Sequence, residues 1–118
     1  NNELGVKVAV TDITQLAKDA EADICSQPRG GHGDEAETST LLYIREDLVH
    51  MDKTVEEYTQ PWPGSVVNVP CRMRTPTGTN GDSTLATKEK GEKILNAMVD
   101  EICGFVHGFV AWQPEEER

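Results

Sequence analysis

The chain has 118 residues, of which 36% are hydrophobic and 5% aromatic, so it fits a single domain, or part of one, with a lean core. A formal net charge of −10 repels nucleic acid and anionic membrane surfaces. Because the sequence also lacks an uninterrupted apolar run of spanning length and a signal-peptide pattern, it predicts neither a nucleic-acid partner nor a membrane partner.

Alternating valines open the first predicted elements. Residues 5–11 have a β-branched period of two, which predicts a strand. In residues 12–22, apolar side chains recur at offsets of three, four and seven, which predicts a short amphipathic helix with Asp12 at its amino-terminal cap. Residues 25–34 contain three glycines and one proline, and are therefore expected to form a loop.

Two longer helices are predicted around an irregular middle segment. Residues 35–49 are predicted to form a helix of about four turns, with Asp34 at its entry. Residues 50–83 are rich in proline and glycine, and only residues 65–69 favour a short strand. The last helix begins at Thr84 or Thr87 and ends near Val106, followed by an acidic tail at 114–118 that is expected to fray.

The predicted order of elements favours an α/β layer. One or two strands do not make a stable sheet alone, so the sheet is expected to be completed by sequence or by a chain outside these residues. This lean composition also predicts an oligomer. The three cysteines, Cys25, Cys71 and Cys103, lie far apart and without metal-binding spacing, which favours reduced thiols and a cytoplasmic location.

The chemically dense segment is HGDEAETS, residues 32–39, where the predicted loop turns into a helix. Glu37 precedes Leu41, Ile44 and Leu48 by four, seven and eleven residues, so these side chains share one helical face. Because that face is apolar, Glu37 is predicted to be buried. A buried carboxylate costs several kcal/mol unless it is paired, so a cation, donor or metal is expected beside it.

Two interpretations of the segment stay open at this point. In the first, Asp34, Glu35 and Glu37 only stabilise the positive end of the helix dipole. In the second, the loop presents His32 at a pocket, where a neighbouring carboxylate orients it as a general acid or base. The spacing of these residues does not separate the two.

Several short motifs together carry a family resemblance. The pattern H-x-x-E-x-E-T-S of residues 32–39, the D-L-V-x-M-D turn of residues 47–52 and the elements GDSTLAT and EKGEK of residues 81–93 resemble the creatininase family of amidohydrolases. The resemblance extends from Val6 to Val106 and covers about half of a family domain. The chain, residues 1–118, is therefore predicted to be the carboxyl-terminal half of a creatininase-like domain.

The resemblance implies a partial creatininase-like α/β fold and hydrolysis of amides, often cyclic amides or formamides, with a divalent metal, Zn or Mn. It implies that His32 is the acid/base residue that protonates the leaving nitrogen, and that Glu35 and Glu37 are catalytic glutamates. No position here matches the family's metal ligands, so none is predicted in this chain. The expected partners are the amino-terminal half, or a companion chain, and a small-molecule substrate.

Other features receive less specific interpretations. Creatininases proper carry a tryptophan where this chain has Pro28, which argues against creatinine itself as substrate. A non-catalytic structural or binding subunit of the same fold is the alternative function. His50 is expected to cap a helix end, and His107 is expected to lie on the surface past the last helix. Trp62 either packs on its turn or stacks on a ligand, and the pair Arg72 and Arg74 is a candidate anchor for a carboxylate or a subunit.

Overall fold

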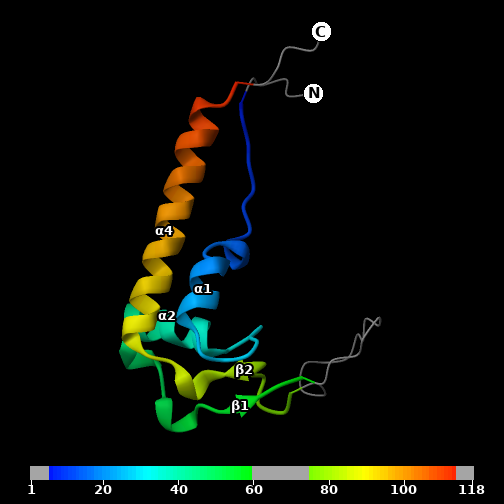
Figure 1. Cartoon of the computed structure of the whole chain (residues 1–118), viewed down its shortest axis with the longest axis vertical. Helices are drawn as coiled ribbons and strands as arrows, with labels where there is room; N and C mark the ends of the chain where they lie inside the picture. Colours follow the sequence, from blue (N-terminus) through cyan, green and yellow to red (C-terminus); the bar gives the residue numbers. More distant parts are fainter. Residues whose placement is uncertain (1–5, 60–74, 114–118) are drawn as a thin grey trace.

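The computed structural model describes residues 6–59 and 75–113 (Figure 1). Its three α-helices within these ranges are α1 (Lys18–Ile24), α2 (Glu35–Arg45) and α4 (Lys88–Ala111). Four short 3-10 helices accompany them, at Ile13–Gln15, Glu46–Leu48, Met51–Lys53 and Ser83–Leu85. The long α4 runs away from a base formed by α2 and the strands, with α1 beside it (Figure 1).

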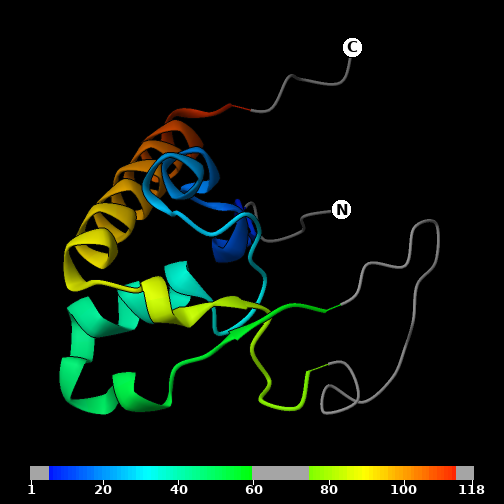
Figure 2. The same ribbon diagram turned by 60° about the horizontal axis from the view of Figure 1, so that its bottom comes forward.

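A small sheet lies at this base. Strands β1 (Glu56–Glu57) and β2 (Gly81–Asp82) pair antiparallel, with Glu56 opposite Asp82. Figure 2 shows these strands beside α2, with the carboxyl-terminal end of α4 far from both. The fold is therefore a partial α/β arrangement, as expected, but its described strands are two residues long and were not predicted.

The predicted strand at 5–11 is wrong for its described part. Residues 6–11 have no regular secondary structure and run alongside α4 (Figure 1), with Val8 80% and Val10 95% exposed. A strand needs a neighbouring strand to satisfy its backbone, and none of the described residues provides one here. The other strand prediction, at 65–69, lies outside the described residues, as does the tail at 114–118.

The first helix also departs from its prediction. The predicted helix 12–22 is divided into the 3-10 turn Ile13–Gln15 and α1, which begins at Lys18. Ala17 separates them, because its backbone is left-handed, with φ 57°. Asp12 does not cap α1, and its carbonyl accepts a hydrogen bond from the Gln15 amide instead.

The two longer helices were predicted more accurately. Asp34 caps α2, and its side chain accepts a hydrogen bond from the Glu37 amide. α2 ends at Arg45, earlier than residue 49, and a 3-10 turn follows it. α4 begins after Thr87, whose hydroxyl accepts from the Lys90 amide, and continues past Val106 to Ala111.

The core lies where α2 crosses the amino-terminal part of α4. Gly91 packs directly on the Ser39 backbone, where a Cβ at position 91 would collide with the Ser39 carbonyl. Ile94, one turn further along α4, is 1% exposed. The buried hydrophobic residues in the described part of the chain are few and small: Ala17, Ala36, Leu42, Ala86 and Ile94. So small a core stabilises a fold of this size weakly.

The carboxyl-terminal half of α4 has little cover. Val99, Phe105, Val106 and Val110 are each 42 to 67% exposed. By length and composition alone, α4 is the one helix among the described residues that could cross a membrane. Core helices of soluble proteins reach the same length and composition, and the absence of a membrane partner stays a prediction.

Lys7 fastens residues 6–12 to the far end of α4. Its ammonium group donates hydrogen bonds to the carbonyls of Phe109, Val110 and Trp112, at 3.2, 3.0 and 2.8 Å. It also lies 5.7 Å from the centre of the Phe109 ring. A cation is favourable there, because the last carbonyls of a helix lack partners within the helix and carry partial negative charge.

Candidate functional site

The loop that carries His32 is fixed at its backbone. The His32 amide donates to the Asn80 carbonyl at 3.3 Å, and the Asn80 amide donates to the His32 carbonyl at 2.7 Å. The Asn80 side chain in turn accepts from the amide and the hydroxyl of Thr59, each at 3.0 Å. The loop thus extends the small sheet by one bridge, which fixes the backbone position from which the imidazole projects.

Glu37 is the carboxylate beside His32. One of its oxygens lies 3.8 Å from the His32 Nδ1 atom and accepts a hydrogen bond from the Gly33 amide at 2.6 Å. Both side chains are open to solvent, His32 at 75% and Glu37 at 56%. The structure therefore brings together two of the predicted site residues in an exposed pair.

Asp34 holds the loop against the start of α2. Its Oδ1 atom accepts from the Glu37 amide at 3.0 Å, and its Oδ2 atom accepts from the Gly31 amide at 2.9 Å. A Cβ on Gly30 would collide with the same carboxylate, which explains glycine at that position. Asp34 therefore supports the loop, as the structural interpretation of the acidic segment expects.

The buried carboxylate belongs to Glu35, and the predicted burial of Glu37 is wrong. Glu35 is fully buried, whereas Glu37 is exposed. The face of α2 that meets α4 carries Ala36, Ser39 and Leu42, whose small members allow close approach at Gly91. The apolar stripe through Leu41 and Ile44 is 43% and 54% exposed at these residues.

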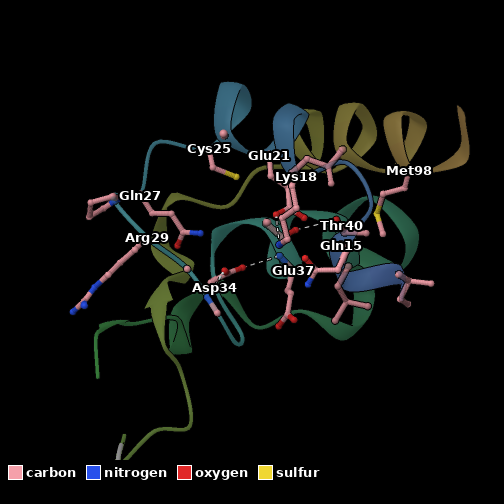
Figure 3. A pocket seen from close by; sticks show the side chains of 18 of the residues that line it. Gln15, Lys18, Glu21, Cys25, Gln27, Arg29, Asp34, Glu37, Thr40 and Met98 are labelled. Carbon is pink, nitrogen blue, oxygen red and sulfur yellow. Dashed lines mark hydrogen bonds and ion pairs between the residues drawn. The ribbon is translucent and has the colours of Figure 1, made fainter. Parts of the chain in front are cut away.

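That stripe lines an open hollow of about 790 Å³. Figure 3 shows α1 and Met98 of α4 on one side of the hollow, and Glu37 and Thr40 of α2 on the other. Lys18 pairs with Glu21 at 2.8 Å on the α1 side. The hollow thus has an apolar floor of side chains from α2 and α4 and a charged rim that includes Glu37.

The described residues do not fit a metal centre by themselves. No group of three or more His, Cys, Asp or Glu side chains in residues 6–59 and 75–113 converges to hold a metal ion. Asp34 and Glu35 are committed to hydrogen bonds with backbone amides. His32 and Glu37 would supply at most a pair of donors.

Two contributors to the site were missed by sequence reasoning, Asn80 and Lys90. Each contacts the loop or α2 from far along the chain, and local periodicity carries no signal of such contacts. His107 is exposed, as expected, but it lies within α4 and not past the last helix. His50 precedes the 3-10 helix Met51–Lys53, and its side chain makes no cap hydrogen bond, so the predicted capping role is wrong. Trp62, Cys71, Arg72 and Arg74 lie outside the described residues, so the interpretations of these four side chains stay predictions.

Comparisons with known proteins place the chain beside characterised enzymes. Residues 3–106 match the family model "Creatininase: Creatinine amidohydrolase". A creatinine amidohydrolase of Pseudomonas putida is 33% identical over 104 residues, which are 82% of this chain and 40% of the relative. A mycofactocin precursor peptide peptidase of Mycolicibacterium smegmatis is 32% identical over 122 residues, which are 97% of this chain and 47% of the relative.

Solved structures agree with the sequence comparisons. A mutant creatininase complexed with creatine superimposes with a TM-score of 0.72 and 28% identity, over 87% of this chain and 44% of the other. A structure described as creatininase with Mn gives a TM-score of 0.69 and 30% identity, over 85% and 42%. A further similar structure is described as a Zn-Zn type creatininase. The chain thus spans less than half the length of these relatives.

Proposed function

Because the chain belongs to the creatininase family, we propose that it forms part of a metal-dependent amidohydrolase that cleaves a carbon–nitrogen bond of a cyclic amide or formamide-like substrate. The observation that carries the proposal is the pair formed by His32 and Glu37, on a loop fixed by Asn80. Glu37 lines the hollow, and His32 lies next to Glu37 outside the lining residues. A relative acting on a precursor peptide supports an amide-bond substrate other than creatinine.

In this proposal His32 is the proton donor to the leaving nitrogen. The Glu37 carboxylate lies beside Nδ1, which leaves the Nε2 nitrogen for the substrate. The two backbone hydrogen bonds between His32 and Asn80 limit the movement of the His32 backbone, so the imidazole is attached at one defined position. Glu35 does not touch substrate, because it is fully buried.

A divalent metal, Zn or Mn, supplies the electrophile that activates the carbonyl when it is bound. Its ligands are proposed to lie outside this chain, since the described residues contain no cluster that would hold it. The similar structures with Mn and with Zn support this choice of metals.

The remaining half of the enzyme is proposed to come from an amino-terminal half or a companion chain. The chain spans 40% and 47% of its two curated relatives. The exposed valines of residues 6–10 and the open stripe of Leu41 and Ile44 are the apolar surfaces that such a half would cover. The assembly is proposed to be an oligomer in the cytoplasm.

The test is His32→Ala in the protein purified with its companion half and supplied with Zn or Mn. Turnover of cyclic amides, formamides and a short peptide is expected to fall about 10² to 10⁴-fold, the usual contribution of a general acid or base. His50→Ala is the control, since His50 is exposed and lies in a different turn. Unchanged turnover in His32→Ala would support the alternative, a non-catalytic subunit of creatininase-like fold.

A further inference from the structure

Glu35 is a fully buried charge with an unusually complete set of partners. Its carboxylate accepts from the Ser26 amide at 2.8 and 3.0 Å and from the Gln27 amide at 2.7 Å, and it pairs with the Lys90 ammonium group. A buried carboxylate is tolerated only when such partners offset its lost hydration. Both oxygens are engaged, so Glu35 has no free lone pair directed at a substrate.

Lys90 brings this pair its counter-charge from α4, and its side chain is only 23% exposed. Besides Glu35, its ammonium group donates to the Leu85 carbonyl at 3.0 Å. Gln27 extends the connection, because its side-chain oxygen accepts from the Glu35 amide at 3.3 Å and from the Asp82 amide at 3.0 Å. The pair therefore joins the His32 loop, α2, α4 and β2 at one buried point.

The pair of Glu35 and Lys90 holds one end of the loop that carries His32. The loop is held at Ser26 and Gln27 by Glu35, at Gly31 by Asp34 and at His32 by Asn80. Only the first of these anchors ties the loop to α4, through Lys90. Loss of the counter-charge would leave Glu35 buried and unpaired, so the loop would have to move to hydrate it.

We propose that Glu35 and Lys90 are positioning residues for His32, and that neither is a catalytic residue. The proposal rests on the proposed function, in which His32 donates the proton. A displacement of the imidazole by about 1 Å is enough to lower a rate about 10²-fold. The pair therefore controls the rate of the proton transfer without contact with the substrate.

The experiment compares Lys90→Met, Lys90→Arg and Lys88→Met in the complete assembly. Lys90→Met is expected to lower kcat roughly 10 to 100-fold, while KM changes less than about threefold, because an interaction made only in the transition state is weakened. Lys90→Arg keeps the charge and is expected to recover part of the rate. Lys88→Met is the matched control, since Lys88 lies on the same helix and pairs with Glu46 at the surface.

A second readout separates this proposal from the proposed function. Hydrogen exchange of the Ser26, Gln27, His32 and Asn80 amides follows the loop whether or not any substrate is turned over. In Lys90→Met, all four amides are expected to exchange faster than in the parent protein. If Lys90→Met does not fold, Glu35→Gln takes its place, because the amide side chain keeps the shape of Glu35 and removes its charge.

The kcat and the hydrogen exchange together decide the proposal. Slower kcat together with faster exchange at His32 supports the positioning role. Faster exchange confined to Ser26 and Gln27, with the kcat of the folded variant unchanged, overturns it and leaves the pair a structural contact only. Faster exchange at all four amides in an assembly that hydrolyses nothing would support the positioning pair and remove the proposed function.

Discussion

Asp34 shows how one short side chain can organise a loop and a helix together. Its two oxygens accept from the Glu37 amide on the helix side and from the Gly31 amide on the loop side. Replacing it with alanine is expected to lower the free energy of unfolding by about 1 to 2 kcal/mol, the upper range for loss of a helix cap. Urea denaturation of the assembly measures the change.

The matched substitution is Asp34→Asn. Asparagine caps helices about as well as aspartate, so this variant is expected to lose less than half of what Asp34→Ala loses. Equal losses in the two variants would mean that the negative charge at the start of α2, rather than the hydrogen bonds, provides the stabilisation.

The residue predictions succeeded where they rested on local chemistry. Asp34 at the helix entry follows from the chemistry of caps, and the structure confirms it. Glu37 shows the opposite case, because the spacing of leucine and isoleucine predicts a core-facing stripe, whereas Leu41 and Ile44 are exposed. The buried residues of α2 include Ser39, because Gly91 of α4 packs closely against it. Serine is polar, so a search for apolar residues at helical spacing does not identify this position as part of the helix contact.

Cys25 provides a prediction about pH. Burial first, and then the nearby carboxylates of Glu35, Asp34 and Glu21, raise the pKa of its thiol from 9.0 to about 11, while Lys90 lowers it slightly. Because the pKa is raised in the folded state, the thiol stays neutral through pH 9. Alkylation of Cys25 by iodoacetamide is therefore expected to be tens of times slower at pH 8 in the folded protein than in urea.

The same shift fixes the direction of a stability change. The folded protein binds the Cys25 proton more tightly than the unfolded chain, so stability is unaffected by this group below pH 9 and falls as pH rises from 9 towards about 11. Site-resolved mass spectrometry at several pH values measures the alkylation, and Cys103, which is exposed, serves as the internal reference. A midpoint for Cys25 near 9 would contradict the prediction.

At the scale of elements, the contact between α2 and α4 depends on the missing side chain of Gly91. Alanine is the better helix former by about 1 kcal/mol, so on helix propensity alone Gly91→Ala would stabilise α4. The collision of its Cβ with the Ser39 carbonyl is expected to reverse the sign and destabilise the protein by about 2 kcal/mol or more.

Two other glycines of the same helix supply the comparison. A Cβ at Gly104 or Gly108 meets nothing within 4 Å, so alanine at either position is expected to stabilise by about 0.5 to 1 kcal/mol. Thermal denaturation of the three variants side by side tests the packing of α2 on α4. Three similar positive shifts would mean that the helices do not approach at Gly91.

Helices and strands were predictable where the signals that define them lie within their own sequence. The helices α2 and α4 have caps and enough length, and both were found close to their predicted ranges. β1 and β2 have two residues each, too few for a period to be visible. Residues 6–11 have the alternating pattern of a strand, but the described residues offer no neighbouring strand, and for this reason the pattern and the structure differ.

At the scale of the whole molecule, the exposed segment 6–11 leads to a test of the companion half. Within the described residues, the Val8 amide donates no hydrogen bond. Val8→Pro removes that donor, so it is expected to change the stability of this chain alone by less than about 1 kcal/mol and yet to weaken a new strand pairing strongly. Native mass spectrometry of the assembly measures the association.

Val8→Thr is the companion variant, since threonine keeps the amide and suits a strand. Retained association in Val8→Thr with loss in Val8→Pro would support a strand docked on residues 6–10. Equal association of both variants with the companion half would exclude this edge as the interface.

The family and the partial α/β fold were predictable from motifs that lie close together in the sequence, and the comparisons confirm both. The sequence also predicted which residues lie close together at the site, since the His32 and Glu37 side chains are neighbours in the structure. The buried pair of Glu35 and Lys90 was not, because it joins residues 55 positions apart and no local rule predicts such a contact. The predicted catalytic roles of His32, Glu35 and Glu37 are untested, and for Glu35 the buried pair with Lys90 favours the proposed positioning role instead.

The left-handed backbone at Ala17 has a consequence for how this sequence can vary. Glycine would relieve a conformation that costs an alanine roughly 1 to 2 kcal/mol, but it would also remove a methyl group that is fully buried. The two effects on stability nearly cancel. A larger side chain would keep the strained backbone and would also not fit the space of the buried methyl group. Selection among homologous chains of this shape should therefore accept glycine and alanine at position 17 about equally and reject branched residues, so that drift there is confined to the two smallest amino acids.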